Sequence, residues 1–327
     1  MNSLELFKTQ KFYQIDISIL KDLGYDVLLS NRIFDSLLFW KYDILFSYFY
    51  RYSFFAALLA KCFGKKTYFT GGIDSLDSDY ASAFNYKIQA LFFKLCYWVA
   101  DSCIIVSQSD LKNIFKVSSL KKKLSYSEHV INTKLFIADV PKEKIFTSIV
   151  WMGDEGNVVR KGVDKALQIF AELKKIPEFV DYRFVIIGRK GEGEVLVRSI
   201  IDKYNLKGSV ELKGEVSEED KINLLKQSKY YFQLSLYEGF GLAALEALCA
   251  NNIIIHSGKG GLANPIYKEQ LLFDIDNDFD SELLKLVNKL ACFTPITSYD
   301  NLLEYYDIQR RKDDFEAIIV NGKSNYK

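Results

Sequence analysis

The sequence has few side chains that commonly bind metals or form disulfides. Its 327 residues include two histidines, His129 and His256. They also include five cysteines that are scattered along the chain without Cys-x-x-Cys spacing: Cys62, Cys96, Cys103, Cys249 and Cys292. Structural zinc sites and disulfide frameworks both need such side chains in closely spaced sets. We therefore expect reduced cysteines and no metal site.

Excess charge and long apolar segments are also missing. The formal net charge is +1, and neither end carries a basic arm, so the composition gives no argument for nucleic-acid binding. Residues 1–11 lack the apolar segment of a signal peptide. The most apolar helical stretch, residues 90–100, is too short to span a bilayer and contains Lys94. These absences predict a cytoplasmic protein.

What the chain does contain is a regular alternation of short apolar runs with helical patterns. This alternation is typical of parallel sheets covered by helices on both faces. We expect strands at residues 2–7, 26–29, 43–48, 67–70 and 102–107, and a long helix over residues 299–320. A chain of 327 residues that is 49% hydrophobic is long enough for two domains. The predicted class is α/β, with two Rossmann-like, doubly wound parallel-sheet domains.

Residues 230–264 concentrate the chemical signals. A buried strand, a glycine-bearing loop, an apolar helix start and a second buried strand follow one another. Glu238 lies in the loop and Glu246 on the helix, so both carboxylates can face one crevice at the carboxyl end of a parallel strand. Carboxylates accept hydrogen bonds from sugar hydroxyls, and free backbone NH groups at a helix start favour a diphosphate. By themselves, two glutamates at this spacing also suit a loop acid and a surface acid.

The full string in this stretch is more specific. It reads Glu238-Gly239-Phe240-Gly241-Leu242 through Leu245-Glu246-Ala247, with Gly260-Gly261 following. In these residues the sequence resembles the retaining, GT-B-fold glycosyltransferases of family 4, the glycosyl transferases group 1 type. The resemblance implies two domains facing a cleft: an acceptor-side domain over residues 1–140 and a nucleotide-sugar domain over residues 141–300. Residues 301–327 would form a helix that crosses back to the first domain.

The resemblance also implies roles for individual residues in a hexosyltransferase that needs no metal. Glu246 would hold the ribose and Glu238 the hydroxyls of the donor sugar. The NH groups of Gly239, Phe240, Gly241 and Leu242 would bind the sugar and phosphate. The donor would be a nucleotide diphosphate sugar, with UDP favoured over GDP by the habit of the family.

Arg160-Lys161-Gly162 is the second candidate cluster. Two cations near the carboxyl end of a strand can clamp a diphosphate and neutralise the leaving group. The alternative is a solvated basic turn. The position resembles the Lys-Gly of the family, which favours the clamp. Asp154 departs from the family pattern, which often has arginine there, and Asn264 stands where the family usually has glutamate.

Gly188, Arg189 and Lys213 are further donor-binding candidates. They lie in stretches that follow or end apolar strands, where backbone groups could contact the base. The loop that begins at Gly188 is rich in glycine, but its spacing is not Gly-x-Gly-x-x-Gly. This spacing argues against a dinucleotide site.

The sequence gives fewer signals for the acceptor site. Gly71, Gly72 and Asp74 follow a strand end and either line a ligand site or form a turn that Asp74 caps. The family often has a histidine in its first domain, and here none precedes His129. The acceptor implied by the resemblance is a saccharide or a lipid-linked saccharide, as in the assembly of bacterial surface polysaccharide or glycoconjugate.

Aromatic residues are dense over residues 39–55, and most are expected in the core. A second interpretation makes residues 37–41, which include Phe39, Trp40 and Lys41, a short wedge at the inner face of the plasma membrane. This would add a peripheral membrane contact to the cytoplasmic location.

Two other functions compete with the transferase. One is a catalytically silent homologue that keeps the fold as a binding subunit, which Asp154, Asn264 and the missing histidine motivate. The retained pair Arg160 and Lys161 and both glutamates argue against it. The other is a nucleotide-sugar epimerase on the same fold, which the glutamate motif disfavours.

Overall fold

The computed structural model describes residues 3–137, 140–293 and 300–323, and it divides the chain into two compact units. The first contains Met1–Ile131 and Glu304–Lys327, and the second contains Asn132–Leu303. The sequence predicted divisions after residues 140 and 300. Residues 138–139 and 294–299, beside those positions, lie outside the described residues.

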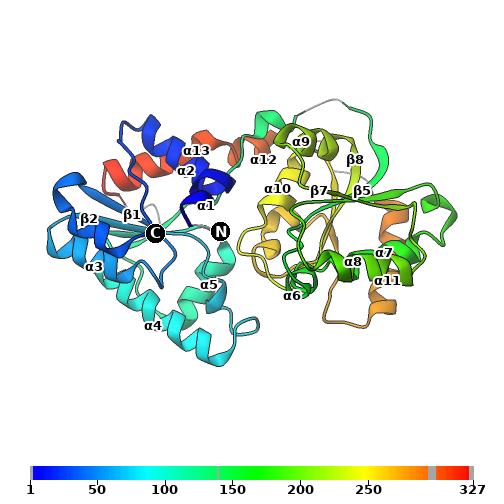
Figure 1. The fold of residues 1–327 in the computed structure, drawn as a ribbon, viewed down its shortest axis with the longest axis horizontal. Helices are drawn as coiled ribbons and strands as arrows, with labels where there is room; N and C mark the ends of the chain where they lie inside the picture. Colours follow the sequence, from blue (N-terminus) through cyan, green and yellow to red (C-terminus); the bar gives the residue numbers. More distant parts are fainter. Residues whose placement is uncertain (1–2, 138–139, 294–299, 324–327) are drawn as a thin grey trace. The chain divides into compact units, whose positions relative to one another are not determined.

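The first unit is built on a four-stranded parallel sheet in the order β1-β2-β3-β4 (Figure 1). Its strands are β1 (Ile44–Tyr48), β2 (Lys66–Thr70), β3 (Ser102–Ile105) and β4 (Leu124–Tyr126). Its α-helices are α1 (Ser3–Thr9), α2 (Lys11–Asp22), α3 (Phe54–Cys62), α4 (Ala83–Val99), α5 (Gln108–Val117) and α13 (Ile308–Phe315). Short helical turns are η1 (Ile33–Leu37), η2 (Phe39–Lys41), η3 (Asp74–Leu76) and the π-turn η8 (Glu316–Val320).

Alternation along the strands places a core on each face of this sheet. Phe69 and Cys103 point to the face that α3, α4 and α5 cover. Their neighbours Tyr68 and Ile104 point to the other face, where they pack with α2 and α13. Successive side chains of a strand point to opposite faces, so nearly continuous apolar strands are what a sheet buried on both sides requires.

Two expected strands of the first unit are wrong. Residues 3–9 form α1, and Asn2, with which the expected strand began, lies outside the described residues. Phe7 packs on Tyr13 and Tyr48, with ring centroids 4.7 and 6.0 Å apart. Residues 26–29 are irregular, and Leu28 is 65% exposed. Short apolar runs do not distinguish strand from helix, so these two stretches could not be assigned from the sequence pattern alone.

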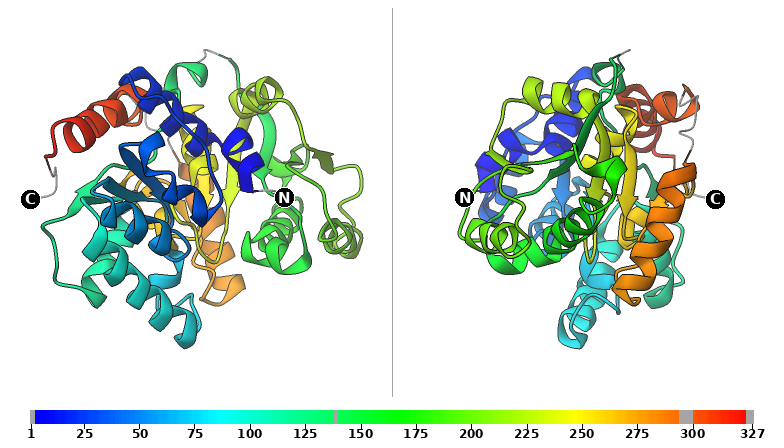
Figure 2. Two further views of the ribbon diagram at one scale, coloured as in Figure 1. Left: turned by 60° about the vertical axis from the view of Figure 1, so that its left-hand side comes forward. Right: turned by 90° about the vertical axis from the view of Figure 1, so that its right-hand side faces the viewer.

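The chain's last helical segment returns to the first unit, but it is not one continuous helix. Tyr299, where the expected helix began, lies outside the described residues, and the segment consists of α12 (Asp300–Tyr305), α13 and η8. Figures 1 and 2 show α13 (red) beside α2 (blue), where Phe315 joins Ile19 in the core. The guanidinium of Arg311, fully buried, donates from Nε and Nη2 to the carboxylate of Asp16 at 2.7 and 2.9 Å.

The second unit has a six-stranded parallel sheet in the order β10-β9-β8-β5-β6-β7. Its strands are β5 (Glu143–Ile149), β6 (Arg183–Ile187), β7 (Val210–Gly214), β8 (Ser228–Gln233), β9 (Ile253–His256) and β10 (Leu271–Leu272). Its α-helices are α6 (Glu155–Arg160), α7 (Val163–Leu173), α8 (Glu194–Lys203), α9 (Glu218–Gln227), α10 (Leu242–Cys249) and α11 (Phe279–Cys292). The shorter turns are η4 (Thr133–Leu135), η5 (Pro177–Phe179), η6 (Gly260–Ala263) and η7 (Pro265–Tyr267).

The strand order of the second sheet reverses at its centre. The first strand along the chain, β5, lies between β8 and β6, so the chain winds outward from β5 in both directions. Open α/β sheets bind ligands at such a reversal, outside the carboxyl ends of the strands. The two α/β sheets confirm the predicted class, and the second unit places a topological switch point between β5 and β8.

Among the described residues, none of the helices is both long and apolar enough to cross a bilayer.

Candidate functional site

The candidate site of the second unit lies at the carboxyl edge of its sheet. Lys161 follows β5 by way of α6, and Glu238 follows β8, so the switch point brings them together. The Nζ atom of Lys161 donates to Oε1 of Glu238 at 2.5 Å. Both side chains are only partly exposed, by 22% for the lysine and 12% for the glutamate. The structure therefore places the expected cation against the expected carboxylate.

The carboxylate of Glu238 is held through one of its two oxygens. Besides Lys161, the Nε2 amide of Gln233 and the hydroxyl of Ser235 donate to Oε1, each at 2.8 Å. In the part of the chain that the structure describes, Oε2 accepts no hydrogen bond. A carboxylate offers lone pairs on both oxygens, so this arrangement fixes the group and leaves Oε2 able to accept further hydrogen bonds.

A buried relay orients the glutamine. The backbone NH of Ile149 donates to the hydroxyl of Tyr231 at 3.2 Å, and that hydroxyl donates to Oε1 of Gln233 at 3.1 Å. Burial raises the pKa of Tyr231 far above its usual range, so the hydroxyl keeps its proton. With its oxygen engaged, the amide of Gln233 turns its NH₂ group toward Glu238. Linked buried hydrogen bonds of this kind give a rigid, defined geometry.

The turn that carries Lys161 depends on a glycine. Gly162 has a φ of 67°, and a Cβ there would collide with the carbonyl of Leu234. Beside this glycine, the backbone NH of Leu236 donates to the carbonyl of Arg160 at 2.8 Å, which links the two loops. Only glycine fits both the left-handed conformation and the close approach. The Lys-Gly pair thus anchors the loop after β5 to the loop after β8.

Arg160 lies beside this pair without touching Glu238. Its Nη2 donates to the side-chain oxygen of Asn157 at 2.6 Å. Asp154, where the family often has arginine, caps α6 by accepting from the NH of Asn157 at 2.6 Å. Asn264 has an analogous role in η7, where it accepts from Ile266 NH at 3.1 Å. Both departures from the family pattern serve as helix caps.

The double glycine supports the glutamate loop. Gly260 has a φ of 59°, and a Cβ there would meet the Glu238 carbonyl. The NH of Gly261 donates to the same carbonyl at 2.6 Å. Phe240 is buried, and Gly241 begins α10 in the left-handed region with Leu242 as the first helical residue. The Gly-Phe-Gly segment therefore lies between α10 and η6, which leaves its backbone tightly fixed.

Glu246 of α10 is buried and forms an ion pair with Lys221 of α9. Both of its carboxylate oxygens accept from Nζ of Lys221 at 2.8 Å, and that lysine also pairs with Glu218 at 3.1 Å. The sequence placed Glu246 at the ribose, and the structure adds a cation from α9 beside it. Its ribose contact stays a prediction.

The remaining donor-site candidates also occupy the carboxyl edge of the sheet. Gly188 and Arg189 follow β6, and Lys213 lies at the end of β7. Gly188 has a φ of 134° and approaches the Val150 carbonyl too closely for a side chain. Arg189 and Lys213 are exposed. β6 and β7 lie successively farther from β5 in the sheet. Gly188, Arg189 and Lys213 could therefore contact only a ligand that extends along the carboxyl edge of the sheet.

Gly71, Gly72 and Asp74 belong to the first unit. Gly71 follows β2 with a φ of 106°, and Asp74 begins η3. Asp110 of α5 lies beneath this loop, where its Oδ1 accepts from Ile73 NH at 3.4 Å. Burial raises the pKa of Asp110 to about 8. The loop follows a strand end as expected, and its part in acceptor binding stays a prediction.

Sequence reasoning missed Gln233, Ser235, Tyr231 and Lys221. Gln233 and Tyr231 alternate along β8 in a run that looked like an apolar strand, and Ser235 looked like an ordinary loop residue. A glutamine at the carboxyl end of a buried strand is the one signal that could have drawn attention, since buried amides need partners. The distant Lys221 carried no signal.

Histidine and metal chemistry add little here. His256 ends β9 and is buried, which lowers its pKa to about 4, so it is neutral near pH 7. Within the described ranges, no set of three or more histidine, cysteine or acidic side chains is grouped as metal ligands would be.

Comparisons with known proteins find a matching family and curated relatives. Residues 156–290 match the family model described as Glycosyl transferases group 1. The chain is 32% identical over 163 residues to the GDP-mannose:cellobiosyl-diphosphopolyprenol alpha-mannosyltransferase of Xanthomonas oryzae pv. oryzae, covering 43% of this chain and 40% of that protein. It is 27% identical over 129 residues to the phosphatidylinositol N-acetylglucosaminyltransferase GPI3 subunit of Saccharomyces cerevisiae, covering 39% and 28% respectively. The chain spans less than half the length of these curated relatives.

Solved structures extend the likeness to both units. Anabaena Alr3699/HepE in complex with UDP-glucose has a TM-score of 0.70 at 12% identity, covering 93% of this chain and 88% of that chain. The trehalose-6-phosphate synthase OtsA has a TM-score of 0.68 at 14% identity, covering 86% and 74%. These likenesses confirm a two-domain, Rossmann-like GT-B fold.

Proposed function

We propose that this chain, which carries a glycosyl transferases group 1 domain on a GT-B fold, is a hexosyltransferase. It moves a hexose-like sugar from a nucleotide diphosphate donor to a hydroxyl acceptor with retention at the anomeric carbon. The observation that carries the proposal is the fixed carboxylate of Glu238 beside Lys161 at the switch point of the second sheet. That pair supplies an acceptor for sugar hydroxyls and a cation for phosphate within one contact.

The chemistry divides between the two charges. Negative charge grows on the diphosphate as the glycosidic bond breaks, and Lys161 with Arg160 would stabilise it. The open Oε2 of Glu238 would accept from donor sugar hydroxyls and so orient the sugar. Both charges are held before the donor arrives, which avoids reorganisation during the reaction. No metal ion takes part in this scheme.

The proposed donor is a UDP-sugar. HepE was crystallised with UDP-glucose, whereas the Xanthomonas relatives are named for GDP-mannose, which makes GDP the competing nucleotide. Glu246 would bind the ribose, which both nucleotides share. The strand ends at Gly188, Arg189 and Lys213 would meet the base.

The proposed acceptor is a saccharide or a lipid-linked saccharide of bacterial surface polysaccharide or glycoconjugate assembly. The Xanthomonas relative is named for a diphosphopolyprenol acceptor, and the yeast relative for phosphatidylinositol. The proposed location is the cytoplasm, in peripheral contact with the inner face of the plasma membrane. Residues 37–41 support that contact, because Trp40 is 67% exposed and Phe39 stacks on Phe63 at 4.2 Å near the surface.

A nucleotide panel tests the donor site directly. A ligand that binds only the folded state adds about 2.7 kcal/mol at a hundredfold excess over Kd, so UDP should raise the melting temperature. The shift should persist in EDTA and should shrink in Glu246→Ala. The matched control is Glu218→Ala, which removes the other carboxylate that pairs with Lys221 but leaves Glu246 in place.

The outcomes separate the competing functions. A larger shift with GDP than with UDP would replace the proposed donor and keep the transferase. Conversion of a UDP-sugar to its epimer, without hydrolysis or transfer, would establish the epimerase. If UDP, GDP, ADP, CMP and TDP all leave the melting temperature unchanged at millimolar concentration, the chain is a catalytically silent binding subunit.

A further inference from the structure

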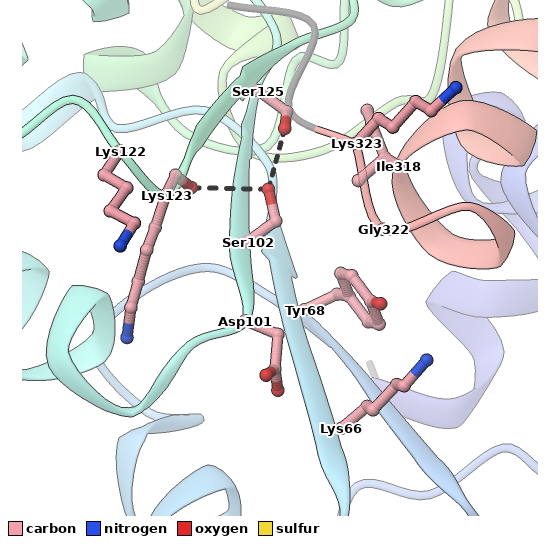
Figure 3. A pocket seen from close by; sticks show the side chains of 10 residues that line it. All are labelled: Lys66, Tyr68, Asp101, Ser102, Lys122, Lys123, Ser125, Ile318, Gly322 and Lys323. Atoms are coloured by element: carbon pink, nitrogen blue, oxygen red, sulfur yellow. Dashed lines mark hydrogen bonds between the residues drawn. The ribbon is translucent and has the colours of Figure 1, made fainter.

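A pocket of about 250 Å³ lies in the first unit, at the amino-terminal ends of β2, β3 and β4. Figure 3 shows Lys122 and Lys123 on one side of Ser102, and Lys66, Tyr68 and Lys323 on the other. A single water needs only about 10 to 15 Å³ of such space, so the pocket has room for a small molecule. This edge is opposite to the one at which open α/β sheets bind their substrates.

The charges around the pocket are unbalanced. Four lysines line it together with one carboxylate, that of Asp101. Both oxygens of Asp101 accept from Nζ of Lys61 at 2.9 Å, and one also accepts from Thr67 NH at 2.8 Å. Its negative charge is therefore already matched by a fifth lysine, Lys61.

Three of the lining lysines have no acidic partner. Lys66, Lys122 and Lys323 form no ion pair with any residue that the structure describes, and all three are exposed. The fourth, Lys123, is pinned, because its Nζ donates to the carbonyls of Trp98 and Tyr97 at 2.8 and 3.3 Å. Burial, and next the charge of Lys61, lower the pKa of Lys123. The pocket thus holds unpaired, mutually repelling cations on flexible side chains.

The neutral groups of the pocket also suit an anion. Burial raises the pKa of Tyr68 to about 12, so its hydroxyl remains a donor at neutral pH. Among the described residues, that hydroxyl donates one long hydrogen bond of 3.4 Å, to the Ile319 carbonyl. Ser102 and Ser125 share a hydrogen bond of 2.8 Å at the floor. Lysine ammonium groups and hydroxyls together match the several acceptor oxygens of a phosphoryl group.

We propose that this pocket binds a phosphorylated anion at a site separate from the donor site of the second unit. Lys66, Lys122 and Lys323 close on the phosphoryl oxygens from both sides of the strand ends, and Tyr68 donates to one of them. The same chemistry is offered by a soluble phosphate compound and by a phospholipid headgroup, so the test includes both sources.

Binding is measured on a Lys161→Ala background, which removes the phosphate-facing lysine of the donor site. Equilibrium dialysis with inorganic diphosphate tests the soluble source. Co-sedimentation with phosphatidylcholine vesicles, with and without phosphatidic acid, tests the headgroup. With at least one probe, Lys66→Ala/Lys323→Ala should weaken binding about tenfold or more, since two charge-assisted contacts are lost.

The matched control is Lys87→Ala/Lys112→Ala, which removes the same charge from exposed lysines of α4 and α5 outside the pocket. It should change binding less than twofold. Lys122→Ala provides an independent variant on the opposite side of Ser102. The proposal is overturned if neither probe binds, or if the control pair weakens binding as much as the pocket pair does. Because every variant is compared on the same Lys161→Ala background and the readout is binding, the outcome is independent of whether the chain transfers sugar.

Discussion

The two units of this protein use similar sheets but differ in how the chain enters them. The second unit is contiguous, starts at its central strand β5 and winds outward, which creates a switch point with Lys161 and Glu238. The first unit runs through β1, β2, β3 and β4 in order, and it is completed by residues from the other end of the chain. The candidate catalytic residues therefore lie in the unit whose strand order reverses.

The two units also differ in how their buried polar groups are hydrogen-bonded. In the second unit they converge on a carboxylate that keeps one oxygen open, Oε2 of Glu238. In the first unit the cluster around Arg311 closes on itself: Arg311 donates to Asp16 and to the carbonyls of Ser127 and Glu128, at 3.1 Å or less. A satisfied buried network makes the fold rigid and specific, whereas an oxygen without a partner is able to accept from a ligand.

The largest effect is expected from breaking the network of the first unit. Arg311→Met leaves Asp16 buried and without its cation, which should lower the free energy of unfolding by about 3 to 5 kcal/mol. Urea unfolding followed by tryptophan fluorescence measures this change. The double variant Asp16→Leu/Arg311→Met should recover much of the loss, because no buried charge is left unpaired. A single variant as stable as the parent would mean that the pair has no structural role.

The next effect tests the open carboxylate of the second unit. Glu238→Ala should lower turnover by roughly 10³-fold, about 4 kcal/mol, because the donor sugar loses its orienting acceptor. The affinity for the free nucleotide should stay nearly constant, since the proposed contact of Glu238 is with the sugar. Turnover and nucleotide titration measure the two quantities. Glu238→Gln keeps the shape of the side chain and separates loss of charge from loss of packing, and unchanged turnover in both variants would remove Glu238 from the mechanism.

Lys161→Ala tests the cation that lies beside Glu238 in the second unit. Losing a cation beside the developing diphosphate charge should cost about 2 to 4 kcal/mol of transition-state stabilisation, read from kcat/KM. The control Lys207→Ala removes an exposed lysine that precedes β7 at the amino edge of the same sheet, and it should be silent. A Lys161→Ala enzyme within threefold of the parent, about 0.7 kcal/mol, would restore the interpretation as a solvated turn.

The smallest effect concerns the surface of the first unit. Phe39→Ser/Trp40→Ser should reduce co-sedimentation with anionic vesicles severalfold, because a short aromatic wedge contributes only part of a weak attachment. Added salt should reduce it again by screening Lys41 and its basic neighbours. The control is Tyr52→Ser, which removes a 78% exposed aromatic residue outside residues 37–41. Binding that ignores both the double variant and the salt would rule out the wedge.

The contrast also explains what the sequence could reveal. The strand, loop and helix around Glu238 are contiguous, so their glycines and acids form a pattern that local reasoning recognises. The contact of Lys161 with Glu238 was not predicted, because it arises only when β5 and β8 become neighbours in one sheet. Gln233 and Lys221 were not predicted, because their contacts form only when β8 and α9 pack beside the carboxylates of Glu238 and Glu246.

In the first unit the same reasoning met elements without a local signature. The apolar run of residues 3–9 fits a strand or a helix, and only packing of Phe7 on Tyr13 and Tyr48 decides for the helix. The aromatics expected in the core divide: Tyr50 and Phe54 are buried, and Trp40 and Phe55 are exposed. Composition could not assign them: the burial of Phe54 and Phe55, for example, depends on which face α3 turns to the sheet.

The ion pair of Arg311 with Asp16 joins residues that are 295 positions apart. A ribosome adds residues one at a time, at about 5 to 20 per second. When Asp16 emerges, its partner does not yet exist, and the whole of residues 132–303 is made before α13 appears. The second unit can therefore fold during synthesis while the first still exposes Tyr68, Ile104 and Ile19. All four strands of the first unit are made early, but one face of their sheet is not fully covered until α13 is synthesised after the second unit.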